Sequence, residues 1–205
     1  MVNRKEQKKR GVPKYKRRKL ILIGVEGDNK TEKQYFNHFN RLQGKYSIRF
    51  ANGNETDPIN IVENIKKAIL KAGGDSFGNG DYAFAVFDTD VAPEKEQAIA
   101  KAKQIAKGTG IKLVLSNPCF EVWFVLHFEC SSAAYPTSDH VIKKLRTFIS
   151  NYEKNEDVYN LLENNIESAI EGAEYLRKTH INCGNKKIID QNPMTDVDVI
   201  IKKLI

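Results

Sequence analysis

A continuous apolar run, Tyr82 to Phe87, leads directly into the sequence Asp88-Thr89-Asp90. A short run of this kind, preceded by a glycine-rich loop and followed by Pro93, predicts a strand buried on both faces. In an extended strand, residues i and i+2 point to the same side and lie about 6–7 Å apart. We therefore expect Asp88 and Asp90 to share one divalent ion or one catalytic role where this strand ends.

Strand and helix patterns alternate along the first part of the chain. Apolar runs predict strands at residues 20–25, 48–51, 82–87 and 111–116, and amphipathic segments predict helices that begin at Thr31, at Asp57-Pro58 and at Pro93. Asn117-Pro118 then starts a helix that is apolar nearly all round and is therefore expected to be deeply packed. The alternation predicts an α/β fold with a mostly parallel sheet covered by helices on both faces.

The rest of the chain has helical periodicity. Beyond Phe128, apolar residues recur at helical spacing, and Asn192-Pro193 begins a turn into a last short helix that runs through Leu204. A chain of 205 residues is long enough for one well-filled core. We predict a basic N-terminal arm at residues 1–19, an α/β core at residues 20–130, and a helical part at residues 131–205 that packs on the core.

Polar side chains gather where the predicted strands end. Parallel α/β sheets bind ligands at the carboxyl ends of their strands. The residues predicted at these ends are Glu26, Asp88, Asp90, Ser116 and Asn117, with Glu121 one helical turn further on. Glu121 also has a simpler interpretation, because the helix dipole favours a negative charge in the first turn of a helix. The pattern leaves both interpretations of Glu121 open.

The oxygen donors of these acids favour a hard cation, Mg²⁺ or Mn²⁺, whose coordination shell is completed by phosphoryl oxygens of a substrate. The four histidines are scattered along the chain and offer no zinc cluster. The three cysteines, Cys119, Cys130 and Cys183, form neither a C-x-x-C pair nor an even disulfide set, so reduced thiols are expected.

The positive charge of the chain is concentrated at its start. Residues 1–19 hold ten basic side chains and one acidic one, whereas the other residues carry 23 basic and 25 acidic groups. A basic arm on a nearly neutral body predicts contact with a polyanion, because lysine and arginine release counterions when they neutralise phosphates. The predicted nucleic-acid-binding residues are Arg10, Lys14, Lys16, Arg17, Arg18 and Lys19. A solvated tail without such a partner is the open alternative.

No part of the sequence predicts a membrane span. The most apolar window, Val122 to Phe128, is far shorter than the roughly 20 residues that a spanning helix needs. The first residues also lack the apolar region of a signal peptide. We therefore expect a cytoplasmic protein with no membrane partner.

Several short motifs carry more information than the acids alone. They are Glu26-Gly27, Thr31-Glu32, Asp88-Thr89-Asp90, Ser116-Asn117-Pro118-Cys119-Phe120-Glu121-Val122-Trp123, Tyr152 with Lys154, and Asn192-Pro193-Met194-Thr195. Together they resemble the motifs of the RloB-like proteins, a prokaryotic family within the topoisomerase–primase (Toprim) class. The resemblance covers roughly residues 20 to 200. It is most specific in the stretch that begins at Ser116 and least specific in the pair of aspartates taken alone.

The resemblance implies a Toprim-like fold in which Glu26 is a general acid/base or metal ligand and Asp88 and Asp90 hold the catalytic ion. Glu121 would be a further acid of the site. The supporting residues would be Gly27, Ser116, Asn117 and Lys154. The implied function is Mg²⁺-dependent hydrolysis or nicking of DNA or RNA, with Glu26 moving a proton. The implied setting is restriction or phage defence, including abortive infection, in some cases beside an ATPase partner.

Two other functions stay open. The chain could be a non-catalytic nucleic-acid-binding or scaffold subunit of a defence complex. More distantly, Asp88-Thr89-Asp90 resembles the opening motif of haloacid-dehalogenase-type phosphatases, in which the first aspartate is a nucleophile. Against that reading, a whole strand–helix unit that contains Glu26 precedes Asp88, and Ala92 stands where that motif has threonine. The sequence has no visible determinant for DNA over RNA or for the oligomeric state.

Overall fold

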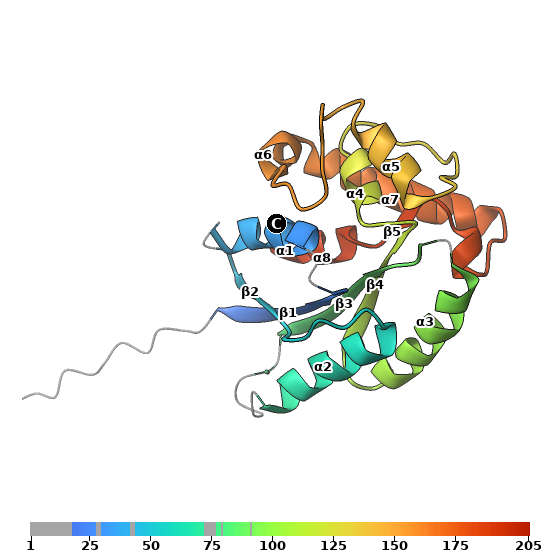
Figure 1. Ribbon diagram of the computed structural model, residues 1–205. Helices are drawn as coiled ribbons and strands as arrows, with labels where there is room; N and C mark the ends of the chain where they lie inside the picture. Colours follow the sequence, from blue (N-terminus) through green and yellow to red (C-terminus); the bar gives the residue numbers. More distant parts are fainter. Residues whose placement is uncertain (1–17, 28–29, 42–43, 72–76, 79, 91) are drawn as a thin grey trace, which may run out of the picture.

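Five strands form one sheet in the computed structural model, which describes residues 18–27, 30–41, 44–71, 77–78, 80–90 and 92–205 (Figure 1). The strands are β1 (Lys19–Val25), β2 (Tyr46–Phe50), β3 (Tyr82–Asp88), β4 (Ile111–Asn117) and β5 (Met194–Thr195), and their order is β2-β1-β3-β4-β5. Strands β1 to β4 are parallel, and β5 is antiparallel to β4. The predicted mostly parallel α/β sheet is confirmed.

Strand β3 lies in the middle of the sheet and is buried on both faces, as its unbroken apolar run predicts. Its alternate residues enter two separate cores, with Phe84 and Val86 on one face and Ala85 and Phe87 on the other. Strand β3 pairs with β1 on one side and with β4 on the other. Because the three strands are parallel, their carboxyl ends meet at one edge of the sheet.

Helices α2 (Pro58–Lys71) and α3 (Pro93–Ala106) cover one face of the sheet (Figure 1). Asp57 caps α2, as predicted, because its Oδ1 accepts hydrogen bonds from the N–H groups of Ile59 and Asn60 at 2.8 and 3.3 Å. A Cβ atom at Gly24 would lie 2.8 Å from the side chain of Ile65. This glycine therefore lets α2 approach β1 closely.

The opposite face is covered by α1 (Lys30–Arg41), α4 (Glu121–Val125) and α8 (Asp198–Leu204), and α5 (Ser138–Leu145), α6 (Tyr159–Leu162) and α7 (Ile166–Asn182) lie beyond them (Figure 1). Two short 3-10 helices, η1 (Glu163–Asn165) and η2 (Ile188–Asp190), complete the described elements. Helix α4 is fully buried, as expected, but it begins at Glu121 rather than at Asn117-Pro118. None of the described helices is both long and apolar enough to cross a membrane.

The last part of the chain completes the sheet. Strand β5 pairs with the end of β4, with Thr195 opposite Ser116. Arg177 of α7 holds the start of α8, because its guanidinium donates to both carboxylate oxygens of Asp198 at 2.7 Å each. Residues 131–205 are thus mainly helical, as predicted, and also supply one short strand. Two residues are too few to produce a strand pattern in the sequence.

The described structure begins at Arg18, within the segment predicted to be a basic arm. The predicted nucleic-acid-binding residues Arg10, Lys14, Lys16 and Arg17 lie outside the described residues. Arg18 is exposed, and Lys19 is already part of β1, where its N–H donates to the Lys45 carbonyl at 3.2 Å. The sheet therefore begins at the last residue of the predicted arm, one residue before the predicted start of the core.

Candidate functional site

Two acidic residues meet where β1 and β3 end. Glu26 directly follows β1, Asp88 is the last residue of β3, and these strands are neighbours in the sheet. The Asp88 N–H donates to Glu26 Oε2 over 3.3 Å. Gly27 turns the chain away with a φ of +58°, and its N–H donates to the Glu55 carbonyl at 2.7 Å. This left-handed conformation favours glycine, so Gly27 supports the position of Glu26 through the backbone.

Asp90 does not continue the strand. Strand β3 ends at Asp88, and Asp90 has a φ of +52°. The N–H groups of Thr89 and Asp90 donate to the carbonyls of Ser116 (2.9 Å) and Pro118 (3.0 Å), which bends the chain toward the end of β4. The expectation that Asp88 and Asp90 share one side of an extended strand is therefore wrong. The Asp90 side chain is 48% exposed, whereas Asp88 is only partly exposed.

A lysine from the first turn of α3 joins these acids. Lys95 Nζ lies 3.0 Å from Glu26 Oε1, 2.5 Å from Asp90 Oδ2 and 3.3 Å from the Asp88 carbonyl oxygen. Burial opposes its charged form, but the hydrogen bonds with Asp90 and Glu26 outweigh burial and raise the pKa of Lys95. Sequence reasoning missed Lys95. The available signal was a cation in the first turn of a helix, where the helix dipole disfavours it.

The charges of four other carboxylates act on Asp88, and we call the five residues the acidic cluster: Glu26, Glu32, Asp88, Asp90 and Glu121. Burial raises the pKa of Asp88 well above its usual range, and the charges of the other four raise it further. A partly exposed carboxyl group on which so many like charges act favours either a proton on itself or a cation beside it.

Glu121 belongs to the acidic cluster although it lies on a different element. It is only 3% exposed, and its Oε1 faces the hydroxyl of buried Tyr152, which donates to it over 3.3 Å. Burial, and then the charge of Glu121, raise the pKa of the Tyr152 hydroxyl, which keeps this group a donor. A carboxylate placed only to complement a helix dipole needs no such burial. Its charge also contributes to the raised pKa of Asp88.

Glu32 is the fifth acid, and sequence reasoning did not assign it to the site. It lies in the first turn of α1 and is buried. Its charge ranks directly after burial among the causes of the raised pKa of Asp88. An acid in the first turn of a helix is normally explained by the dipole. The pattern alone therefore offered no reason to separate Glu32 from an ordinary surface charge.

The segment between α5 and α6 lies against α1 beside the acidic cluster. The Asn155 N–H donates to Thr31 Oγ1 at 2.9 Å, and the Lys30 N–H donates to Asn155 Oδ1 at 3.1 Å. Asn151 and Asn155 have φ values of +61° and +70°, a left-handed conformation that asparagine adopts more readily than most residues. Thr31 thus lies inside α1 and bonds this segment, rather than opening the helix as predicted.

Lys154 of the same segment brings a second positive charge toward the acids. Burial opposes its charged form, but the charge of Glu121, followed by those of Asp88 and Asp90, raises its pKa. No ion pair links Lys154 to an acid within the described residues, and the residue is exposed. Its ammonium group is therefore available to a ligand that approaches the acidic cluster.

Ser116 and Asn117 face the C-terminal part of the chain. Ser116 Oγ lies 2.9 Å from Thr195 Oγ1. The Asn117 side-chain amide donates to the carbonyls of Ile188 and Gln191, both at 2.9 Å. These two residues hold β5 and η2 in place. Ser116 is also the register partner of Asp88, and its backbone carbonyl accepts from the Thr89 N–H.

The donor chemistry of the acidic cluster fits a hard cation. All its side-chain donors are carboxylate oxygens, and all three cysteines are free of disulfides. The point between Glu26 and Asp90, where Lys95 Nζ lies, is one at which positive charge is favoured. Within the described part of the chain, no group of three or more His, Cys, Asp or Glu side chains is arranged so that it could hold a metal ion by itself. Mg²⁺ needs no such group, because it often takes one or two carboxylates and completes its shell with water and substrate phosphates.

These features define a class, an α/β protein with a mostly parallel sheet and acidic residues gathered where β1 and β3 end. Comparison with protein families identifies the member of that class: the family model described as RloB-like protein matches residues 21–204. The chain therefore belongs to the RloB-like family, as its motifs predicted. No curated protein and no solved structure matches it.

Proposed function

We propose that this chain hydrolyses or nicks phosphodiester bonds of DNA or RNA with Mg²⁺ or Mn²⁺, as a component of a prokaryotic restriction or phage-defence system. The observation that carries the proposal is that Glu26 and Asp88 meet where the neighbouring strands β1 and β3 end, with the Asp88 N–H donating to Glu26 Oε2, while burial and like charges raise the pKa of Asp88. This edge is where parallel α/β sheets bind ligands. Membership of the RloB-like family supports the proposed setting.

Glu26, Asp88 and Asp90 are the residues that would hold the ion. A bound Mg²⁺ supplies stabilisation of the negative charge that develops on phosphoryl oxygens. Asp88 gains most from a neighbouring cation, because the four surrounding carboxylates disfavour its charged form. Lys95 contacts Glu26 and Asp90 from the same side, so its ammonium group competes for their oxygens.

Glu26 is the acid best placed to move a proton. Its Oε2 is oriented by the Asp88 N–H and its Oε1 by Lys95, so both oxygens have fixed directions. A general base must lie within hydrogen-bond distance of the proton it takes. Lys154 supplies a positive charge for a substrate phosphate, and the buried hydroxyl of Tyr152 keeps Glu121 oriented.

The basic residues at the start of β1 would bind nucleic acid away from this point. Lys19 begins β1 and Glu26 follows its last residue. Seven steps of about 3.3 Å place the two ends roughly 20 Å apart. Lys19 and a group bound at Glu26 would therefore contact different phosphates of the nucleic acid.

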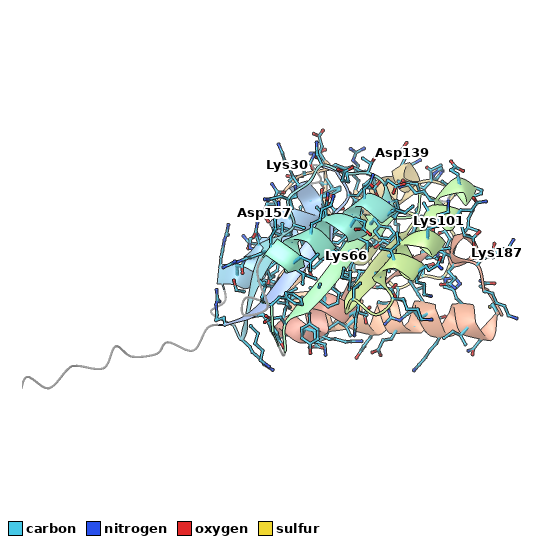
Figure 2. The ribbon with its side chains drawn as sticks, turned by 90° about the horizontal axis from the view of Figure 1, so that it is seen from below. Lys30, Lys66, Lys101, Asp139, Asp157 and Lys187 are labelled. Carbon is cyan, nitrogen blue, oxygen red and sulfur yellow. The ribbon has the colours of Figure 1, made fainter. Side chains whose placement is uncertain are left out.

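The test is a cleavage assay. Supercoiled plasmid, single-stranded DNA and RNA are incubated with the protein in Mg²⁺, in Mn²⁺ and in a chelator. We expect cleavage that needs the metal and that falls at least about a hundredfold in Asp88→Asn, since that change removes a charged ligand. Asp139→Asn, an exposed residue on α5 labelled in Figure 2, is the matched control and should cleave normally. Equal cleavage by Asp88→Asn and the unaltered protein would refute the proposal.

A second candidate function is a non-catalytic nucleic-acid-binding subunit. The observation that favours it is Lys95, which already balances Glu26 and Asp90 with a positive charge. Salt-sensitive nucleic-acid binding that persists in Asp88→Asn, disappears when residues 1–19 are removed, and is accompanied by no turnover in either metal would select this function.

A further inference from the structure

The outer edge of β4 is only partly paired. Strand β5 covers just Ser116 and Asn117, so among the described residues the rest of β4, from Ile111 to Leu115, has a strand neighbour only on the β3 side (Figure 1). An exposed strand edge presents a row of backbone donors and acceptors that can pair with another chain.

The hydrogen bonds at the end of β4 show which backbone groups face outward. The Thr89 N–H donates to the Ser116 carbonyl on the β3 side, whereas the Asp196 N–H donates to the Leu115 carbonyl on the outer side. Because the directions alternate along a strand, the groups of Leu113 also face outward. We find no hydrogen bond to the Leu113 N–H or carbonyl on that side within the described residues. At the start of the strand, the Ile111 N–H is satisfied by Thr109 Oγ1 at 3.2 Å.

A large groove runs along this edge. It has a volume of about 1020 Å³ and lies between α3 and the segment around η2. Apolar residues from both sides line it, including Ile99 and Ala106 of α3, Leu113 of β4, Ile188 of η2 and Met194 of β5. An apolar lining beside unpaired backbone groups is the combination that an added peptide strand uses, because the backbone supplies affinity and alternate side chains fill the groove.

The rim of the groove is basic. Four exposed lysines line it, namely Lys103, Lys107, Lys112 and Lys186, and none of them forms an ion pair with an acid of the described chain. Arg177 also lines the groove, but its guanidinium is held by Asp196 and Asp198. The charge available to a ligand is therefore strongly positive.

We propose that the free edge of β4 accepts an extended acidic segment of a partner protein as an additional strand. Backbone groups of that segment pair with Leu113, its apolar side chains enter the groove, and its carboxylates face the four lysines. A second copy of this chain is a poor occupant, because it would place like charges opposite each other. Nucleic acid is a poorer occupant than a peptide, since its phosphates only accept hydrogen bonds and its backbone carries no N–H group to pair with the Leu113 carbonyl. The inference is independent of the proposed nuclease function.

The first experiment measures binding of a fluorescent peptide by anisotropy. The peptide has about eight residues, the length of an ordinary strand, in which valine alternates with glutamate. A second peptide, in which lysine replaces glutamate, is the charge control. We expect micromolar binding of the acidic peptide only, weakened at least tenfold in the Lys103→Glu/Lys112→Glu variant. Lys101→Glu, on α3 but outside the groove lining, should bind normally (Figure 2).

The second experiment tests the strand pairing itself. In the unaltered protein, amide exchange at Leu113 should slow when the acidic peptide binds, while amides of β2 should not change. Leu113→Pro removes the outward N–H without removing a donor to β3, and it should abolish binding in protein that still unfolds cooperatively. Absence of binding, equal binding of the lysine peptide, or unchanged exchange at Leu113 would each overturn the proposal. A single-stranded oligonucleotide that binds with the same lysine dependence while the peptide does not would assign the groove to nucleic acid instead.

Discussion

Two aspartates of this protein have opposite electrostatic surroundings. Asp198 is fully buried, yet its carboxylate receives two hydrogen bonds from Arg177 and one from Lys202, all at 2.7 Å. Asp88 is surrounded by four other carboxylates, and its pKa is raised. Lys95 reaches the Asp88 backbone carbonyl rather than its carboxylate.

The difference separates a structural acid from a candidate functional one. The partners of Asp198 join α7 to α8 and balance its charge, so stability alone explains them. Among the described residues, no basic side chain bonds the Asp88 carboxylate in this way, and burial and like charges both disfavour its ionised form. Strongly perturbed carboxylates of this kind are typical of sites that bind cations or move protons.

The largest effect should follow from breaking the balanced aspartate. Asp198→Ala leaves Arg177 and Lys202 without their shared partner, and we expect the free energy of unfolding to fall by about 3 kcal/mol. Urea unfolding followed by circular dichroism measures the change. Asp139→Ala, on the exposed side of α5, should change stability by less than about 0.5 kcal/mol. If Asp198→Ala lowered the free energy of unfolding no more than Asp139→Ala, the contacts of Asp198 with Arg177 and Lys202 would not be structural.

Metal binding at Asp88 should stabilise the protein. At a free Mn²⁺ concentration about a hundred times the dissociation constant, the free energy of unfolding should rise by about 2.7 kcal/mol. For a chain of this size that corresponds to a rise in the melting temperature of roughly 5–10 °C. Asp88→Asn should abolish the rise and Asp198→Asn should not. An identical rise in Asp88→Asn would place the ion elsewhere.

Removing the competing lysine should strengthen metal binding. In Lys95→Met the ammonium group no longer neutralises Glu26 and Asp90, so we expect Mn²⁺ to bind roughly tenfold more tightly, or about 1.4 kcal/mol, by titration calorimetry. Lys101→Met, from the exposed side of the same helix, should leave the affinity unchanged. Weaker binding in Lys95→Met would mean that the lysine orients the carboxylates for the ion.

The smallest effect concerns stability without metal. The folded protein holds a proton on Asp88 at a pH where the unfolded chain, with a pKa of about 3.9, has lost it. The free energy of unfolding therefore falls as the pH rises from the pKa of the unfolded chain to the higher pKa of the folded protein. Above the folded pKa, Asp88 is ionised in both states and the destabilisation by its charge is complete. Asp88→Asn should be more stable than the unaltered protein by about 1 kcal/mol at pH 8, with the difference vanishing near pH 4. A difference that grows as the pH falls would contradict the assignment.

Much of the fold follows from local patterns. The unbroken run before Asp88 predicted a buried strand, the Asp57-Pro58 pair predicted a helix start, and both are confirmed. The length of α4 was overestimated, because an apolar stretch beyond a strand reads the same whether it forms a helix or a buried turn. Strand β5 was missed because its pairing with β4 joins residues nearly eighty positions apart.

Some residues of the candidate site could likewise be selected from the sequence, and others could not. Glu26, Asp88 and Glu121 could be selected from the sequence because each stands close to the end of a predicted strand, and carboxyl ends of parallel strands converge. Glu32 and Lys95 could not, since each lies in the first turn of a helix whose direction toward the strand ends is set by packing. The charges on one helix do not show which charged side chains of other elements will lie beside them.

The sequence by itself determined the class of fold, the acids at the strand ends and the family, because these depend on residues close together in the chain. The tertiary structure decided that Asp90 leaves the strand, that Lys95 lies between Glu26 and Asp90, and that the edge of β4 is left partly open. These features depend on distances between elements that are far apart in the chain. Such distances are set by how the two cores pack on the sheet, which no local pattern encodes.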